Sequence, residues 1–483
     1  MALGALLAVH LLLGLAHAGT FIPDDADQVI FSQSLERGYH EQPPLYSWLA
    51  WLFFRVFGLT FFAWGLLKTM ILGAIYLALY RSAQLLLGGE GRAALAAFAV
   101  LLIPTFAWHS FYYLTHTNLV CAAGAATFYF LLRVQREGRW SSYTLLGLSL
   151  GLGTLSKYNY VCFATALLGA GLTISSFRVR LLHPRMIWSL LIAAVLVAPN
   201  ASWAWDNRDV LLGTFNHKLG IDANGAVGGR AAGLLTLITN LSLILLPVGV
   251  LGWFLSRAKV QAEDLKSRAS DDARKLLGRF LVGAFTLLVL MVALAGATRF
   301  HERWLQPFTL LAPLFAFSHA RRHALPAVQR RRLVSIFAAS ALICAALRFG
   351  QLFVAGADRG IYSLRSDFTS AAEQLHSVVG SSATIIGADR EICGNLRYQL
   401  PRARFICVQF PLYVPPLESR NGPHVLVWNT RAGESPPAPL LTFAKQMNLP
   451  APVSPTISFL DVPSKLPGDP TNRLAFCVLV TEP

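Results

Sequence analysis

The stretch that decides the fold is residues 233–256, which read GLLTLITNLSLILLPVGVLGWFLS and carry no charged side chain. A helix needs about 20 apolar residues to cross the hydrocarbon core of a bilayer, and this run is long enough. Comparable apolar runs recur along the chain up to residue 355. Of 483 residues, 54% are hydrophobic and only 14% are charged, against about 25% charged in ordinary soluble domains. The composition therefore predicts an α-helical, polytopic membrane protein.

Eleven segments are predicted to span the membrane. They are residues 2–18, 60–80, 93–108, 118–133, 143–156, 159–176, 186–204, 233–256, 280–297, 305–319 and 333–355. The first is expected to be a retained helix, because no basic residue precedes its apolar run as in a signal peptide. Two alternatives stay open: cleavage after Ala16-His17-Ala18, or a true start upstream.

The positive charges favour a membrane topology over nucleic-acid binding. The net charge of +16 is spread over short basic clusters between the apolar runs, such as 133–136, 178–185 and 321–332. Cytoplasmic loops are typically rich in Lys and Arg, so these clusters are predicted to face the cytoplasm. The loops 19–59, 109–117, 205–232 and 298–304, with the hairpin at Lys157, then lie outside. We therefore expect a multi-pass protein of the bacterial inner membrane that binds no nucleic acid.

The composition changes after Ala355. Residues 356–483 contain Pro/Gly/Ser-rich loops, strand-like runs at 383–386 and 424–428, and a helix-like stretch at 370–379. This pattern predicts a small α/β domain on the extracytoplasmic side, following a transmembrane domain of residues 1–355.

The six cysteines lack the spacing of a metal site. Cys393 and Cys407 in the C-terminal segment could form a disulfide if that segment is extracytoplasmic, or remain free buried thiols.

The first outside loop concentrates acidic residues. It holds Asp24, Asp25, Asp27, Glu36 and Glu41 in a chain with only 25 acidic residues. A carboxylate beside the bilayer can act as a general base toward a hydroxyl or can bind a divalent cation. The alternative is helix capping by Asp24 or Asp25.

These motifs resemble the GT-C glycosyltransferases of the dolichyl-phosphate-mannose–protein mannosyltransferase-like superfamily, whose bacterial branch includes the aminoarabinose transferase of lipid A. The acidic pair is followed by a turn that ends in Pro-Pro-Leu, and further motifs occur in family order. The matching stretches are Asp24-Asp25-Ala26, His40-Glu41-Gln42-Pro43-Pro44-Leu45, Leu155-Ser156-Lys157-Tyr158, Ala198 to Trp203, and Arg299 to Pro307.

The resemblance implies an inverting transfer of a sugar from a polyprenyl-phosphate carrier to a lipid, glycan or protein acceptor. Asp24 is the predicted base, with Asp25 beside it, and Glu41 is expected to orient the acceptor or the base. The carrier phosphate needs cations at the outer membrane boundary, where Lys157, Arg299 and Arg303 fall. Residues that are candidates for contacts with substrate are His40, Tyr158, His217 and His301.

Each of these roles has a plainer alternative. Lys157 could be a lysine that snorkels at a helix end, and Arg303 and His301 could anchor the chain at the interface. For His217 a solvated loop is favoured. Asn118 replaces an acidic residue of the family pattern, which weakens mechanisms with two carboxylates and leaves a divalent cation open; no other cofactor is predicted.

Two other functions remain as rivals. A transporter or flippase of lipid-linked glycans is expected to carry charges at mid-membrane and to show repeated halves, whereas this sequence places its acids at the outer boundary and shows no half-to-half repeat. A scaffold that presents the C-terminal domain leaves the clustered acids unexplained.

Overall fold

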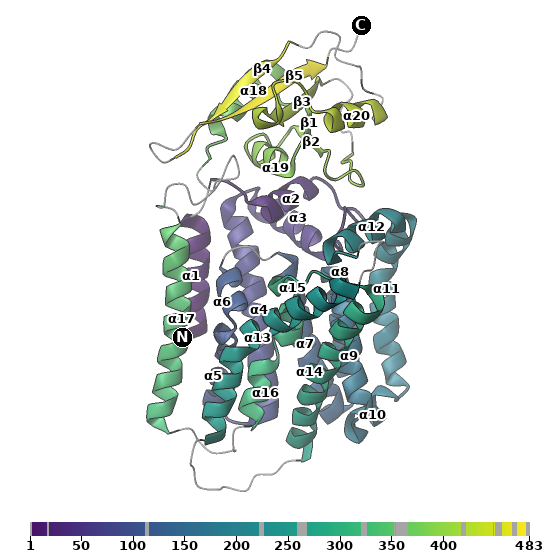
Figure 1. Cartoon of the computed structure of the whole chain (residues 1–483), viewed down its shortest axis with the longest axis vertical. Coiled ribbons are helices and arrows are strands. Elements are labelled where there is room, and N and C mark those ends of the chain that lie inside the picture. The colour runs from purple at the N-terminus through teal and green to yellow at the C-terminus, as the bar shows by residue number, and fades with distance from the viewer. Residues whose placement is uncertain are drawn as a thin grey trace. The chain divides into compact units, whose positions relative to one another are not determined.

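The computed structural model describes residues 2–16, 19–111, 115–221, 227–257, 268–319, 326–351, 353, 366–416, 422–447, 449, 456–465 and 471–479. Helices dominate, and a single small sheet lies near the C-terminus of the described chain (Figure 1). The chain divides into two compact units. The first unit comprises Met1–Leu7, Glu41–Leu45 and Met70–Cys344, and the second comprises Ala8–His40, Tyr46–Thr69 and Ala345–Pro483.

The helices that belong wholly or mostly to the first unit follow one another with short connections. They are α4 (Phe61–Leu87), α5 (Glu90–Phe98), η1 (Ala99–Leu102), α6 (Pro104–Ser110), α7 (His116–Glu137), α8 (Trp140–Ser156), α9 (Tyr160–Leu172), α10 (Ser175–Leu181), α11 (Arg185–Asp206), α12 (Arg208–Leu219), α13 (Val227–Arg257), α14 (Arg268–Ala295), α15 (Glu302–Thr309), α16 (Ala312–His319) and α17 (Ala327–Gly350).

Among the described residues, six of these helices are long and apolar enough to cross a membrane, namely α4, α7, α11, α13, α14 and α17. The bent pair α9 and α10, at 116°, would make a seventh. The chain is therefore a multi-pass membrane protein, as predicted, while the eleven expected spans include several shorter helices. Apolar side chains on α11, such as Leu191 and Val195, are exposed, as expected of a surface that faces lipid.

One predicted span is not a continuous helix. Residues 93–108 form α5, η1 and α6, and the chain is extended at Ile103, with ψ of 106°. Ile103 precedes Pro104, and the proline ring disfavours helical geometry in the residue before it. The proline then occupies the first position of α6, where its missing N–H costs nothing.

Small residues allow the helices of the first unit to approach closely. A Cβ added at Gly147 of α8 would lie 2.6 Å from the Ser189 carbonyl oxygen on α11. One added at Gly151 would lie 2.8 Å from the Leu196 side chain. Small residues at helix contacts are typical of membrane bundles, because packing replaces the hydrophobic effect there.

The second unit combines short helices from the N-terminal part with the sheet domain. Its elements are most of α1 (Ala2–Ala16), α2 (Pro23–Phe31), most of α3 (Leu45–Phe57), α18 (Thr369–Val379), β1 (Thr384–Gly387), α19 (Arg390–Gln399), β2 (Arg404–Cys407), β3 (His424–Asn429), η2 (Thr430–Ala432), α20 (Ala438–Gln446), β4 (Ser458–Val462) and β5 (Asn472–Leu479). The predicted strands at 383–386 and 424–428 and the helix at 370–379 are confirmed as β1, β3 and α18.

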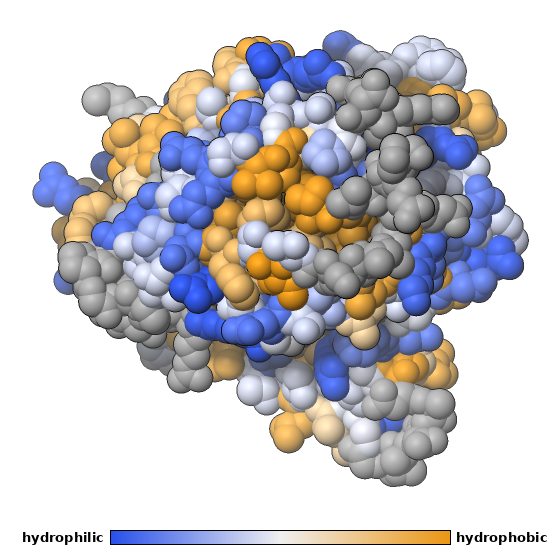
Figure 2. Space-filling model, turned by 90° about the horizontal axis from the view of Figure 1, so that it is seen from above, coloured by the Kyte–Doolittle hydropathy of each residue, from blue (hydrophilic) through white to orange (hydrophobic). Residues whose placement is uncertain are grey.

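The sheet has the strand order β2-β1-β3-β5-β4. β1 pairs in parallel with β2 and β3, whereas β5 is antiparallel to β3 and β4. Successive side chains point to opposite faces, so Ile385 joins one hydrophobic core with α18 and α19 while Ile386 joins another with α20. The surface drawn in Figure 2 is mixed, with hydrophobic patches among hydrophilic residues.

The cysteines settle one open alternative. All six are free thiols, and Cys393 and Cys407 are buried rather than bridged. The Cys393 thiol donates to the Ile406 carbonyl oxygen at 3.5 Å.

Candidate functional site

The acidic cluster of the first loop lies on α2 in the second unit. The helix begins at Pro23, which follows the extended residue Ile22, and Asp24 and Asp25 occupy its first turn. The N-cap residue is Ile22, which makes no side-chain cap, so neither Asp24 nor Asp25 is the capping residue. Both carboxylates still lie where the helix dipole favours negative charge.

Asp25 is held in a buried ion pair with a lysine. The Lys68 ammonium on α4 lies 2.8 Å from each carboxylate oxygen, and the side chains are 13% and 9% exposed. The ammonium also lies 4.8 Å from the centroid of the Trp64 ring. Burial raises the pKa of Asp25, and the charge of Lys68 opposes that rise. Because both Asp25 oxygens accept from Lys68, a hydroxyl could deliver a proton to this carboxylate only by displacing the ammonium.

Asp24 has a more open position. Its side chain is 35% exposed, and Arg390 lies 3.9 Å away, measured from guanidinium nitrogen to carboxylate oxygen. The same guanidinium donates to Asp27 at 3.0 Å. Arg390 is the first residue of α19, so a cation from the sheet domain lies beside the acids of α2.

Close packing explains how α19 reaches α2. Gly394 of α19 approaches Ala26 so closely that an added Cβ would lie 2.6 Å from the Ala26 Cβ. One residue on, the Asn395 side chain accepts from the Phe21 N–H at 2.6 Å and donates to the Phe21 carbonyl at 3.0 Å. A small residue and a bridging amide thus fix the two helices together.

A separate cavity of about 520 Å³ lies in the first unit. The charged residues of its lining are Glu41, Lys157, Arg208 and Lys218, and most of the other lining residues are aromatic or aliphatic. The lining residues are Glu41, Gln42, Lys157, Tyr158, Asn159, Cys162, Ala204, Trp205, Arg208, Leu211, Leu212, Thr214, Phe215, Lys218, Leu219, Leu288, Met291, Phe300, Trp304, Leu305 and Phe308. An apolar cavity with a few cations suits an amphiphile that has an anionic head and a hydrocarbon tail.

Lys157 enters this cavity from the turn that ends α8. The residue leaves the helix with extended geometry, φ −166° and ψ 137°, which turns the chain into α9. Its ammonium donates to the Thr117 hydroxyl at 2.8 Å. The neighbouring Asn159 amide donates to the Trp304 carbonyl at 3.2 Å and ties the turn to α15. The predicted residues Lys157 and Tyr158 therefore line one wall.

Glu41 meets Lys218 in the same cavity. The ammonium and carboxylate lie 2.5 Å apart, and the side chains are 36% and 29% exposed. Lys218 lies in the last turn of α12, next to His217, for which the sequence favoured a solvated loop. With Lys157, Arg208 and Lys218 against Glu41, the described lining carries more positive than negative charge.

Other predicted site residues lie outside the lining of this cavity. Arg299, His217 and His301 are exposed, and Arg303 is half-buried. The rings of His301 and Trp304 form a T-shaped pair with 4.6 Å between centroids. His40 belongs to the second unit, where its ring contacts Phe410 at 5.3 Å between centroids. Among the described residues, no group of three or more His, Cys, Asp or Glu side chains could hold a metal ion.

Sequence reasoning missed Lys68, Arg390 and Arg208. Lys68 could have been found, because a charged residue within an apolar helix is expensive and commonly functional. Arg390 carries no such signal, since it belongs to an ordinary surface pattern of the sheet domain.

The comparisons with known proteins agree with this architecture. Residues 41–203 match the family model of dolichyl-phosphate-mannose-protein mannosyltransferase. The chain is 28% identical over 411 residues to the lipopolysaccharide core galacturonosyltransferase RgtA of Rhizobium johnstonii, covering 84% of this chain and 81% of the relative. It is 27% identical to RgtB of the same organism, with the same described activity, covering 95% and 93%.

The fold is similar to a solved structure. The crystal structure of ArnT from Cupriavidus metallidurans bound to undecaprenyl phosphate superimposes with a TM-score of 0.59 and 13% sequence identity. The match covers 99% of this chain and 98% of that one, so the two proteins share a fold. The resemblance predicted from the sequence motifs is confirmed.

Proposed function

We propose that this chain, a bacterial glycosyltransferase of the GT-C type, moves a sugar from a polyprenyl-phosphate carrier to a lipopolysaccharide acceptor. The transfer takes place at the outer face of the inner membrane and inverts the anomeric carbon. The basic loops of the sequence support this orientation, because cytoplasmic loops are typically rich in Lys and Arg, and the acidic loop and residues 356–483 fall on the other side of the predicted spans.

The donor is proposed to bind in the amphipathic cavity of the first unit. Its apolar wall, with Leu212, Met291 and Phe308, suits an isoprenoid tail. Lys157 and Lys218 suit the carrier phosphate, because ammonium groups bind phosphate as point charges and stabilise the charge that develops on it as it leaves.

The reaction needs one base and no general acid. The acceptor hydroxyl oxygen forms a bond to the anomeric carbon while the bond from that carbon to the phosphate oxygen breaks. Asp24 takes the hydroxyl proton, and the carrier phosphate departs with the electron pair. The exposure of Asp24 supports this role, whereas both oxygens of Asp25 are engaged by Lys68. Glu41 orients the acceptor or the base.

The relatives indicate the sugar. RgtA and RgtB are lipopolysaccharide core galacturonosyltransferases, so galacturonic acid is the first donor sugar to test. Its carboxylate adds a second negative charge to the carrier phosphate. The three cations in the cavity lining against one acid suit such a doubly anionic head group.

The test is transfer of radiolabelled sugar from a set of short-chain polyprenyl-phosphate donors to rough lipopolysaccharide. Wild type, Asp24→Asn and the control Asp461→Asn would be compared in matched amounts. Asp461 is an acid of β4 whose side chain is 57% exposed and which lies outside the lining of the cavity, so its replacement should leave transfer unchanged. We expect label in lipopolysaccharide from wild type and control, and its loss in Asp24→Asn.

Two results would contradict the proposal. Undiminished transfer by Asp24→Asn would show that Asp24 is not the base. The protein would instead be a transporter if no donor supported transfer and lipid-linked glycan crossed the membrane of reconstituted vesicles.

A further inference from the structure

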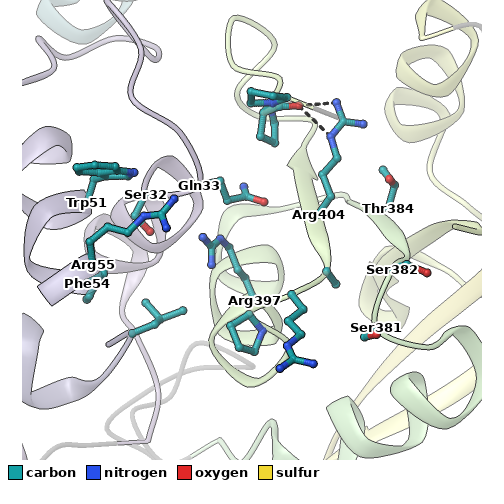
Figure 3. A pocket seen from close by; sticks show the side chains of 16 residues that line it. Ser32, Gln33, Trp51, Phe54, Arg55, Ser381, Ser382, Thr384, Arg397 and Arg404 are labelled. Carbon is teal, nitrogen blue, oxygen red and sulfur yellow. Dashed lines mark hydrogen bonds between the residues drawn. The ribbon is translucent and has the colours of Figure 1, made fainter. Parts of the chain in front are cut away.

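A second cavity, of about 580 Å³, lies in the second unit between α3 and the sheet domain (Figure 3). It is separate from the residues assigned to catalysis. The lining residues are Ser32, Gln33, Trp51, Phe54, Arg55, Leu59, Ser381, Ser382, Thr384, Arg397, Pro401, Arg402, Ala403, Arg404, Pro415 and Pro416.

The lining is strongly basic. Four of these residues are arginines, and the described residues that line the cavity include no aspartate or glutamate. Arg55 comes from α3, whereas Arg397, Arg402 and Arg404 come from α19 and the chain around the start of β2, so the charges approach from two sides (Figure 3). Arginine stays charged at neutral pH, and like charges around one cavity repel each other in the empty state. An anionic ligand would relieve that repulsion.

The arginines are partly fixed before any ligand arrives. The Arg404 guanidinium donates to the Pro415 carbonyl from Nε at 2.9 Å and from Nη2 at 2.5 Å, as drawn in Figure 3. The Arg55 guanidinium stacks over the Trp51 ring, 5.4 Å from its centroid. Arg397 is buried, with 7% of its surface exposed. Fixed side chains lose little conformational entropy on binding, which favours affinity.

The remaining lining suits a glycan. Ser381, Ser382 and Thr384 supply hydroxyl groups on one side, and Trp51 supplies an aromatic ring on the other. A single lipid phosphate would neither fill the volume of this cavity nor contact all four guanidinium groups. Several anionic groups on linked sugars would use both, because guanidinium pairs bidentately with phosphate and carboxylate.

We propose that this cavity, which we call the arginine pocket, binds the phosphate- or carboxylate-bearing glycan of the acceptor glycolipid. The pocket is a site of acceptor recognition and takes no part in bond breaking. This inference rests on the proposed function, because it assigns the acceptor of the same transferase.

The test uses the full-length protein in nanodiscs of zwitterionic lipid. Fluorescently labelled rough lipopolysaccharide would be titrated onto wild type and onto the double variant Arg55→Gln/Arg402→Gln, whose arginines are exposed and therefore suited to replacement without unfolding. The matched control is Lys445→Gln/Arg473→Gln, which removes two exposed positive charges of the same unit outside the pocket. Where transfer is measurable, the KM for lipopolysaccharide, the KM for donor and kcat would be measured in parallel.

We expect the pocket variant to bind lipopolysaccharide at least fivefold more weakly than the control, with a correspondingly higher acceptor KM. Its donor KM and kcat should match the control, and added salt should weaken wild-type binding more than variant binding. Equal affinities of the two double variants would overturn the proposal. Equally tight binding of a labelled phosphatidylglycerol to the pocket would also overturn it, since the pocket would then hold ordinary membrane lipid. The binding titration needs no turnover, so a failure of the proposed function is seen separately as absent transfer.

Discussion

The ion pair between Lys68 and Asp25 offers the sharpest perturbation of the candidate site. The ammonium lies 2.8 Å from both carboxylate oxygens, and neither side chain is more than 13% exposed. Replacing Lys68 by Met keeps the approximate volume but leaves a buried carboxylate without its cation. Removing one partner of a buried pair costs about 3–5 kcal/mol, because the remaining charge keeps its desolvation penalty.

This cost should be visible in thermal unfolding of the purified protein in detergent. For units of about 150–250 residues, each kcal/mol lowers the midpoint by about 2–4 °C, so Lys68→Met should unfold about 10 °C below wild type. The loss should shrink at lower pH, because protonation of Asp25 removes the unpaired charge. Transfer activity should fall as well, since the pair fixes α2, on which Asp24 lies.

The double variant Asp25→Asn/Lys68→Met separates stability from function. Replacing both charges by neutral groups removes the desolvation penalty, so we expect a midpoint close to that of wild type. Activity should nevertheless remain low if the charged pair contributes to the site. A wild-type midpoint for Lys68→Met would refute the buried-pair argument, and a double variant with full activity would show that the pair is purely structural.

Three further results are expected. Lys157→Met should raise the KM for donor about tenfold or more, because a hydrogen bond to a charged group contributes about 1.5–3 kcal/mol; an equal rise in Arg279→Met, an arginine outside the cavity, would contradict this. Donors with shorter prenyl chains should bind progressively more weakly to wild type, and an affinity independent of chain length would argue against the apolar wall as the tail site. Burial raises the pKa of Glu391 to about 7 from an ordinary 4.5, so its contribution to stability is present below pH 4.5 and lost as the pH rises through 7. The unfolding midpoint of wild type should therefore fall more steeply between about pH 4.5 and pH 7 than that of Glu391→Gln. Parallel pH profiles of the two proteins would show that Glu391 does not cause this fall.

Several features of the fold followed from local sequence alone. The apolar runs predicted a multi-pass membrane protein, because membrane insertion depends on hydropathy summed over about 20 consecutive residues. The strands β1 and β3 and the helix α18 were also predicted, since each has a matching local pattern. The broken helix at residues 93–108 escaped notice, although Pro104 carries the signal for it.

The sequence also determined the family resemblance, through short motifs that lie in order along the chain. It placed Glu41, Lys157 and Tyr158 in the candidate set, and these residues do line one cavity. It could not tell them from Arg299 or His217, which lie outside the lining, because each is a polar residue beside an apolar run.

Only the tertiary structure decided which charges meet. Lys68 pairs with Asp25 across 43 residues, and Arg390 reaches Asp27 across 363 residues. The arginine pocket likewise joins α3 to residues after 380. Such contacts depend on how helices and sheet pack, through close approaches such as that of Gly394 to Ala26. Hydropathy is a property of consecutive residues and can be read from the sequence. The pairing of charges depends on which side chains lie close together in the folded chain, and only the tertiary structure gives that.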